Sequence, residues 1–309
     1  MAEDWIATTL HISKNYLKVL VSPENPDVDI IAVHGLNPKN TESHAEAIWT
    51  VEDKLWLRDF LPLQLLSARV LLFGYNANVA FETSIAGVRE QAINLLNLIA
   101  SKRDDHDENR PIVFVAHSLG GIVVKRAMVE AKLDDSYNSI REAAYGIAFF
   151  GTPHQGGNLA KLGDIAASVV RGVLRNPSNT FMEALKDSLF SDTLVGDFRH
   201  QLIVDQKSAT LGLAGLRERQ IPMDADHTQI CKFESAEGDD YEQVSFNLRR
   251  LVKSAVKAAA ERAEKVMDQA NAFRAAGLGK KKTLFLVPFG QDNQFVGRED
   301  IISVIDEKL

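Results

Sequence analysis

The sequence predicts an α/β protein in which helices cover both faces of a mainly parallel sheet and a long C-terminal helix follows. Short apolar runs alternate with segments whose apolar residues recur every three or four positions, a pattern typical of parallel strands joined by helices. The predicted strands are Tyr16–Val21, Val28–Val33, Ala68–Tyr75, Pro111–Ala116 and Tyr145–Gly151. The predicted helices are Ser84–Ser101, Gly120–Lys132, Lys161–Leu174 and an Ala- and charge-rich stretch from Asp239 to about Ala276.

The first two predicted strands are separated by Ser22–Asp27, which contains two prolines with Asn and Asp. These residues favour a turn, so we expect the two strands to form a hairpin. The second strand, Val28–Val33, is nearly continuous in Ile and Val, which is typical of a strand buried on both faces.

Composition and charge exclude some classes of function for this protein. The 309 residues are 45% hydrophobic and 25% charged, as in ordinary soluble globular proteins, and the net charge of −7 argues against a nucleic-acid partner. Cys231 is the single cysteine, and the sequence shows neither a signal peptide nor an apolar run of about 20 residues. We therefore expect an intracellular, cytoplasmic protein without a transmembrane segment, whose contact with membranes, including organelle membranes, is at most peripheral.

The segment Ala116–Gly121 (AHSLGG) follows a buried strand and opens a predicted helix. A serine becomes a nucleophile when a base takes its proton and a pocket receives the oxyanion. Gly120 and Gly121 leave room for close helix packing, so that Ser118 projects from the sheet as a nucleophile elbow, the feature of an α/β-hydrolase fold. Ala116 stands where G-x-S-x-G has its first glycine and is small enough for the turn. A helix-capping role for Ser118 is the alternative.

The oxyanion pocket is predicted from the turn His34-Gly35-Leu36, which follows the second strand. Hydrolases of this fold place a backbone N–H there, and we assign the oxyanion to the N–H groups of Leu36 and Leu119. A plain glycine turn is the alternative. His34 precedes the nucleophile, whereas the chain order in this fold is serine, acid, histidine, so a structural role is expected for it.

The same order places the catalytic base after Ser118. The histidines there are His154, His200 and His227. His227 is favoured because its polar loop, Met223–Gln229, follows the strand-like Leu202–Val204, where this fold presents its histidine. His117 is expected to line the elbow or to pack beneath it.

Several motifs occur together in a specific order. They are Ile31–Leu36, Trp49, Arg69–Tyr75, Ala116–Lys125, Phe149–His154 and Asp226–Phe233. In this order they resemble lipase-like serine esterases, and more narrowly the N-terminal hydrolase domains of fungal NLR-like signalling proteins, over residues 10–250. The resemblance implies a serine hydrolase that cleaves a carboxylic ester or lipid acyl bond through an acyl-enzyme, in an immune-like signalling context with NLR-like partners.

The C-terminal part changes character. Val287–Phe289 and Phe295–Glu299 resemble the opening of an NB-ARC or NACHT module, but no G-x-x-x-x-G-K-[ST] phosphate loop occurs, so neither a nucleotide nor another cofactor or metal is expected. We divide the chain into a hydrolase domain at 10–250, a helical spacer at 251–282 and an incomplete module start at 283–309.

The triad acid is the weak point of the pattern. The resemblance implies a further strand carrying the acid before Leu202–Asp205, but Asp197–Gln201 runs directly into that segment. Asp205 is our candidate, because it ends a predicted strand and precedes His227, whereas Asp224 and Asp226 are interpreted as solvating loop groups. The alternative function is a catalytically impaired hydrolase-fold signalling or interaction domain. A structural α/β domain with a chance Ser-x-Gly turn is a third interpretation.

Overall fold

A computed structural model of the chain describes residues 15–37, 43–75, 77, 85–103, 107, 109–152, 154, 218–225 and 227–275. The strands are β1 (Tyr16–Val21), β2 (Val28–Val33), β3 (Thr50–Val51), β4 (Lys54–Leu55), β5 (Ala68–Gly74), β6 (Ile112–His117) and β7 (Ala144–Phe150). The α-helices are α1 (His44–Ala47), α2 (Trp56–Asp59), α3 (Leu61–Gln64), α5 (Ile85–Lys102), α6 (Leu119–Leu133), α7 (Asn138–Ala143) and α11 (Asp239–Ala275), with a 3-10 turn, η2, at Asp135–Tyr137.

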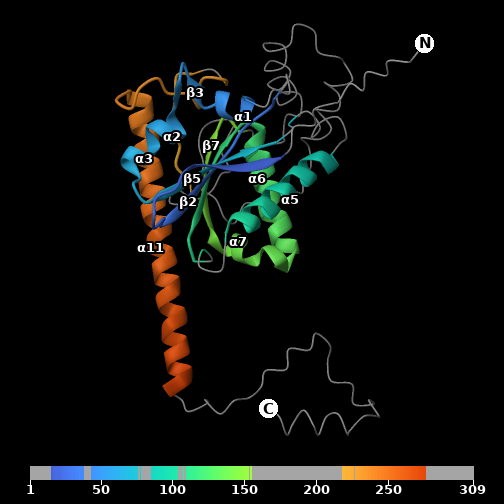
Figure 1. Ribbon diagram of the computed structural model, residues 1–309, viewed down its shortest axis with the longest axis vertical. Coiled ribbons are helices and arrows are strands. Elements are labelled where there is room, and N and C mark those ends of the chain that lie inside the picture. Colours follow the sequence, from blue (N-terminus) through green and yellow to red (C-terminus); the bar gives the residue numbers. More distant parts are fainter. Residues whose placement is uncertain are drawn as a thin grey trace, which may run out of the picture. The chain divides into compact units, whose positions relative to one another are not determined.

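The main sheet has the order β1-β5-β2-β6-β7 (Figure 1). The pairs β5-β2, β2-β6 and β6-β7 are parallel, and β1 joins β5 antiparallel at the edge. The predicted hairpin is wrong: β1 and β2 lie on opposite sides of β5 and do not pair with each other. All six residues of β2 are buried, which fits a strand with neighbours on both sides, whereas β1 is half exposed and takes the edge.

Alternate residues of the central strands enter two separate cores. Ile31, Val33 and Phe114 face α5 and α6, whose buried side chains complete one core. Ile30 and Ala32 face the other core. That second core includes residues of α1, α2, α3 and the first half of α11, such as Trp56, Tyr241, Val244 and Leu248. Figure 1 shows the sheet between these two groups of helices. The predicted α/β class, with helices on both faces, is confirmed.

The helix α11 spans 37 residues, and its described core residues lie in its first half, which packs into the second core. Tyr241 and Ala255 are buried, whereas Val266 and Met267 are 63% and 68% exposed. The chain divides within α11 into two compact units, Met1–Ala260 and Glu261–Leu309.

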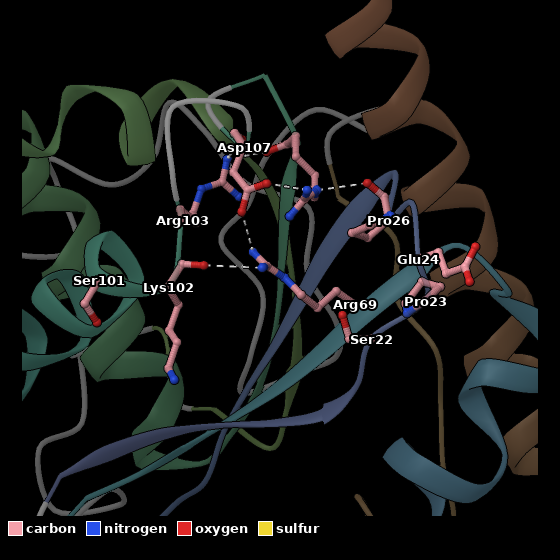
Figure 2. A pocket seen from close by; sticks show the side chains of 10 residues that line it. Ser22, Pro23, Glu24, Pro26, Arg69, Ser101, Lys102, Arg103 and Asp107 are labelled. Carbon is pink, nitrogen blue, oxygen red and sulfur yellow. Dashed lines mark hydrogen bonds and ion pairs between the residues drawn. The ribbon is translucent and has the colours of Figure 1, made fainter.

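A buried ionic network ties the amino ends of the central strands. Asp29 and Arg69 are register partners near the starts of β2 and β5, and Asp29, which is 1% exposed, also pairs with Arg103 and Arg110. Asp107 pairs with Arg69 and Arg110 beside a cavity of about 400 Å³ (Figure 2). Such a network costs much to disrupt, because removing one partner leaves buried charge uncompensated.

Several predicted features lie outside the described residues. They are the helix Lys161–Leu174, the segment Asp197–Asp205 with His200, the loop residue Asp226 and the chain after residue 275. Within the described part, no helix is long and apolar enough to cross a membrane, and no cluster of three or more His, Cys, Asp or Glu side chains could hold a metal ion.

Candidate active site

Ser118 stands alone between the last residue of β6 and the first residue of α6, with φ 51° and ψ −120°. A positive φ is uncommon for a residue other than glycine, and a strained strand-to-helix turn is what exposes the serine of a nucleophile elbow. Backbone bonds hold it there. Its N–H donates to the Phe150 carbonyl at 2.8 Å, and its own carbonyl accepts from the Gly121 N–H at 3.1 Å and the Thr152 hydroxyl at 2.9 Å.

The two glycines after Ser118 are required by close packing. A Cβ on Gly120 would lie less than 3.0 Å from the backbone carbonyl oxygens of Val33 and His34. A Cβ on Gly121 would meet Thr152 equally closely. The start of α6 therefore packs directly on the carboxyl end of β2, as the elbow prediction requires.

The side chain of His227 lies within hydrogen-bonding distance of Ser118. Its Nε2 lies 2.8 Å from the Ser118 Oγ, a distance at which the serine hydroxyl donates to an unprotonated Nε2. Gly151, at the end of β7, has φ 57°, and a Cβ there would lie 3.1 Å from the His227 Nδ1. The bare backbone of Gly151 thus leaves room for the imidazole beside the elbow.

The turn His34-Gly35-Leu36 lies against the same serine, because a Cβ on Gly35 would be 2.9 Å from the Ser118 Cβ. Leu36 and Leu119 are both buried. Leu119 opens α6, and the first N–H groups of a helix have no partner within it and carry the positive end of its dipole. The two predicted oxyanion donors therefore belong to backbone segments that both adjoin Ser118.

His34 is locked in a neutral form that holds this turn. Its Nδ1–H donates to the Gly35 carbonyl at 2.7 Å, and its Nε2 accepts from the Tyr75 N–H at 3.2 Å. Burial, and then the nearby His44, lower the pKa of His34 to about 3. In a trans peptide the C=O and the following N–H point in opposite directions, so fixing the Gly35 carbonyl also fixes the Leu36 N–H.

The other predicted site residues are placed differently. His154 is buried in edge-on contact with the Phe149 ring, and neither ring nitrogen has a hydrogen-bond partner in the structure. Burial, and then the charge of Lys125, lower the pKa of His154 well below its usual value. Asp224 is exposed. Asp205 lies outside the described residues.

Two hydrogen bonds at the site were not predicted from the sequence. The Thr152 hydroxyl bonds the Ser118 carbonyl, and the His117 Nε2 lies 2.8 Å from the His227 backbone carbonyl oxygen. Thr152 belongs to the Gly-Thr-Pro-His motif, one of the motifs that carry the resemblance to serine esterases. The His117 contact joins residues 110 positions apart in the chain, so no local sequence pattern predicts it.

The chain is similar in sequence to a family of known proteins and to individual relatives. The family described as Putative serine esterase (DUF676) matches residues 24–169, which include the elbow. The chain is similar to Protein SERAC1 of Danio rerio, with 26% identity over 240 residues that cover 66% of this chain and 36% of that protein. It thus spans little more than a third of that relative.

The chain is also similar to solved structures, at low sequence identity. One is the NocB thioesterase domain from the nocardicin cluster, with 12% identity and a TM-score of 0.44 over 77% of this chain and 99% of that one. Another is the Bacillus licheniformis lipase BlEst2, with 16% identity and a TM-score of 0.37 over 62% and 71%. By its sheet, its elbow and its family match, the chain has an α/β-hydrolase fold of the esterase- and lipase-like kind.

Proposed function

We propose that this protein is a serine hydrolase that cleaves a carboxylic ester or lipid acyl bond through an acyl-enzyme. The observation that carries the proposal is the 2.8 Å contact between the Ser118 Oγ and the His227 Nε2 at a residue of positive φ. The match to a family described as a serine esterase supports the same chemistry.

The reaction follows from the roles of these groups. The Ser118 Oγ attacks the acyl carbon while the His227 Nε2 takes its proton, and the oxyanion is received by the N–H groups of Leu36 and Leu119. The protonated His227 then gives its proton to the leaving alcohol, which departs as the acyl-enzyme forms. Water, deprotonated by His227, attacks the acyl group and releases the carboxylic acid, and the proton returns to Ser118.

Two parts of the proposal rest on sequence. Asp205 is proposed as the acid that orients His227, because it ends a predicted strand and precedes the histidine. The likeness of Val287–Phe289 and Phe295–Glu299 to an NB-ARC or NACHT opening supports an intracellular, immune-like signalling context with NLR-like partners.

Turnover of p-nitrophenyl esters of increasing acyl length tests the proposal. We expect the wild type to turn over, and Ser118→Ala and His227→Ala to lower kcat by about 10³-fold or more. Ser136→Ala is the matched control, because Ser136 is exposed in η2, away from the elbow, and should leave kcat unchanged. The acyl length with the highest kcat/KM assigns the substrate class.

Two results would contradict the proposal. The first is turnover that survives Ser118→Ala. The second is a folded wild type that hydrolyses no ester of the series, which would favour the catalytically impaired signalling domain instead.

A further inference from the structure

We infer that His117 is a positioning residue, which holds the loop that carries the catalytic base against the nucleophile elbow. The inference rests on the proposed function, because it concerns the same serine and histidine. Its starting observation is the hydrogen bond that the His117 Nε2–H donates to the backbone carbonyl of His227 at 2.8 Å.

The base needs such an anchor because no regular element carries it. Residues 218–225 and 227–238 form neither helix nor strand. Two other bonds anchor this loop further on. The Trp56 Nε1–H donates to the Cys231 carbonyl at 2.9 Å, and the Cys231 thiol donates to the Ile48 carbonyl at 3.3 Å. The His117 bond acts at the catalytic residue itself.

The imidazole of His117 is itself held on several sides. It is 3% exposed and packs edge-on against the buried Trp49, with ring centroids 6.3 Å apart. Its Nδ1 lies beside Gly35, since a Cβ on that glycine would come within 2.9 Å of it. The ring therefore lies between the oxyanion turn and the base loop and fixes the distance between them.

The hydrogen bond also fixes the tautomer. The His227 carbonyl accepts, so Nε2 must carry the proton, and the buried Nδ1, which has no partner, is the lone-pair nitrogen. The opposite tautomer would bury an unpaired N–H and would turn a lone pair toward the carbonyl oxygen, and both are unfavourable. The titratable groups that act on the ring are His227, His44 and Lys232; with burial, which is the largest cause, they lower the pKa of His117 to about 3.

A small displacement of the base loop has a large kinetic effect. A misplacement of roughly 1 Å can cost about 10²-fold in rate, because attack and proton transfer depend on alignment. Loss of the His117 bond should therefore lower kcat, while substrate binding, which does not use this bond, should change little.

The kinetic test compares two substitutions of similar size. His117→Gln keeps an N–H donor that can reach the His227 carbonyl, whereas His117→Leu has none. With p-nitrophenyl esters we expect His117→Leu to lower kcat at least about tenfold with KM within about twofold, and His117→Gln to stay within about threefold of the wild type. A wild-type kcat in the leucine variant, or equal losses in both variants, would overturn the inference.

A second measurement is independent of activity. In ¹⁵N-histidine spectra recorded from pH 8 to pH 5, we expect a signal of a neutral, Nε2-protonated histidine that does not titrate and that is missing in His117→Gln. An Nδ1-protonated or titrating His117 would show that the bond is absent, whatever the turnover. A wild type with this signal but without ester turnover would instead refute the proposed function and leave the anchoring contact in place.

Discussion

Ser118 is held in an unfavourable backbone conformation by bonds on both sides of it. Its N–H is bound by the Phe150 carbonyl, and its carbonyl is bound by Gly121 and the Thr152 hydroxyl. A positive φ costs a non-glycine residue about 1–3 kcal/mol, so the surrounding contacts must stabilise Ser118 in this conformation by more than that. This turn places the Ser118 Oγ 2.8 Å from the His227 Nε2.

Three histidines near the site, the buried His34 and His117 and the half-buried His44, are expected to make the fold sensitive to acid. Burial is the largest cause that lowers the pKa of His34 and His117 to about 3 and that of His44 to about 4, all from an ordinary value of 6.5. Below pH 6.5 the unfolded chain binds protons that the folded chain does not, so stability is present above pH 6.5 and is lost as the pH falls.

The expected size of this loss can be measured. Each such histidine lowers the free energy of unfolding by about 1.4 kcal/mol per pH unit once the pH is well below 6.5. Urea unfolding between pH 6 and pH 5 should therefore show a falling stability, and His117→Gln should reduce the slope by about one histidine's share. A stability that does not change from pH 7.5 to pH 5 would show that these imidazoles are not held neutral.

The sequence predicts site residues where a local pattern or the chain order of the fold indicates them. Ser118 was predicted from a buried strand followed by Ser-x-Gly-Gly, and His227 from the chain order of the fold. The structure brings these two side chains together. The bond from His117 to the His227 carbonyl joins residues far apart in the chain and depends on the packing of Trp49 and Gly35, which no spacing rule describes.

At the scale of elements, the site depends on how closely α6 approaches β2. The helix begins at Leu119, and Gly120 lies against the carbonyl oxygens of Val33 and His34. The same approach sets the distance between the oxyanion turn and the start of α6. The packing of α6 on β2 therefore also determines where the proposed oxyanion donors lie.

We expect Gly120→Ala to destabilise the fold by about 1–3 kcal/mol and to lower ester turnover at least about tenfold, because backbone atoms, unlike a flexible side chain, cannot move aside. Gly238→Ala is the matched control, since the nearest atom to a Cβ there is 3.6 Å away. The control should change the free energy of unfolding by less than about 0.5 kcal/mol. Chemical unfolding and kcat measured on both variants decide the matter. Equal behaviour of the two would show that α6 does not depend on this contact.

The five strands of the main sheet were predicted well, whereas the short elements β3, β4, α1, α2, α3 and α7 were not predicted and the pairing of β1 with β2 was wrong. Predicted strand ends agree with β1, β2, β5, β6 and β7 to within about one residue, because apolar runs bounded by Gly and Pro set them. The hairpin was wrong because a six-residue linker with two prolines is compatible both with a tight turn and with a crossing over one strand. The burial of β2 between two neighbouring strands decides between the two arrangements. That burial depends on the position of β5, which lies some 40 residues further along the chain.

In the whole molecule, the buried ionic network and the proposed active site lie at opposite ends of the strands of one sheet. The network of Asp29 with Arg69, Arg103 and Arg110 ties the amino ends of the strands. Ser118 follows the carboxyl end of β6, which is where ligands bind in open α/β sheets. The buried ionic network and the proposed active site are therefore separated by the length of the strands.

The central claim is that Ser118 is a nucleophile activated by His227. Its most direct test is the labelling of the full chain with a fluorophosphonate, followed by mass spectrometry of the peptides. We expect a single adduct on Ser118, absent in Ser118→Ala and formed at least about 10²-fold more slowly in His227→Ala. Labelling that persists in Ser118→Ala, or a folded wild type that gains no adduct, would contradict the account.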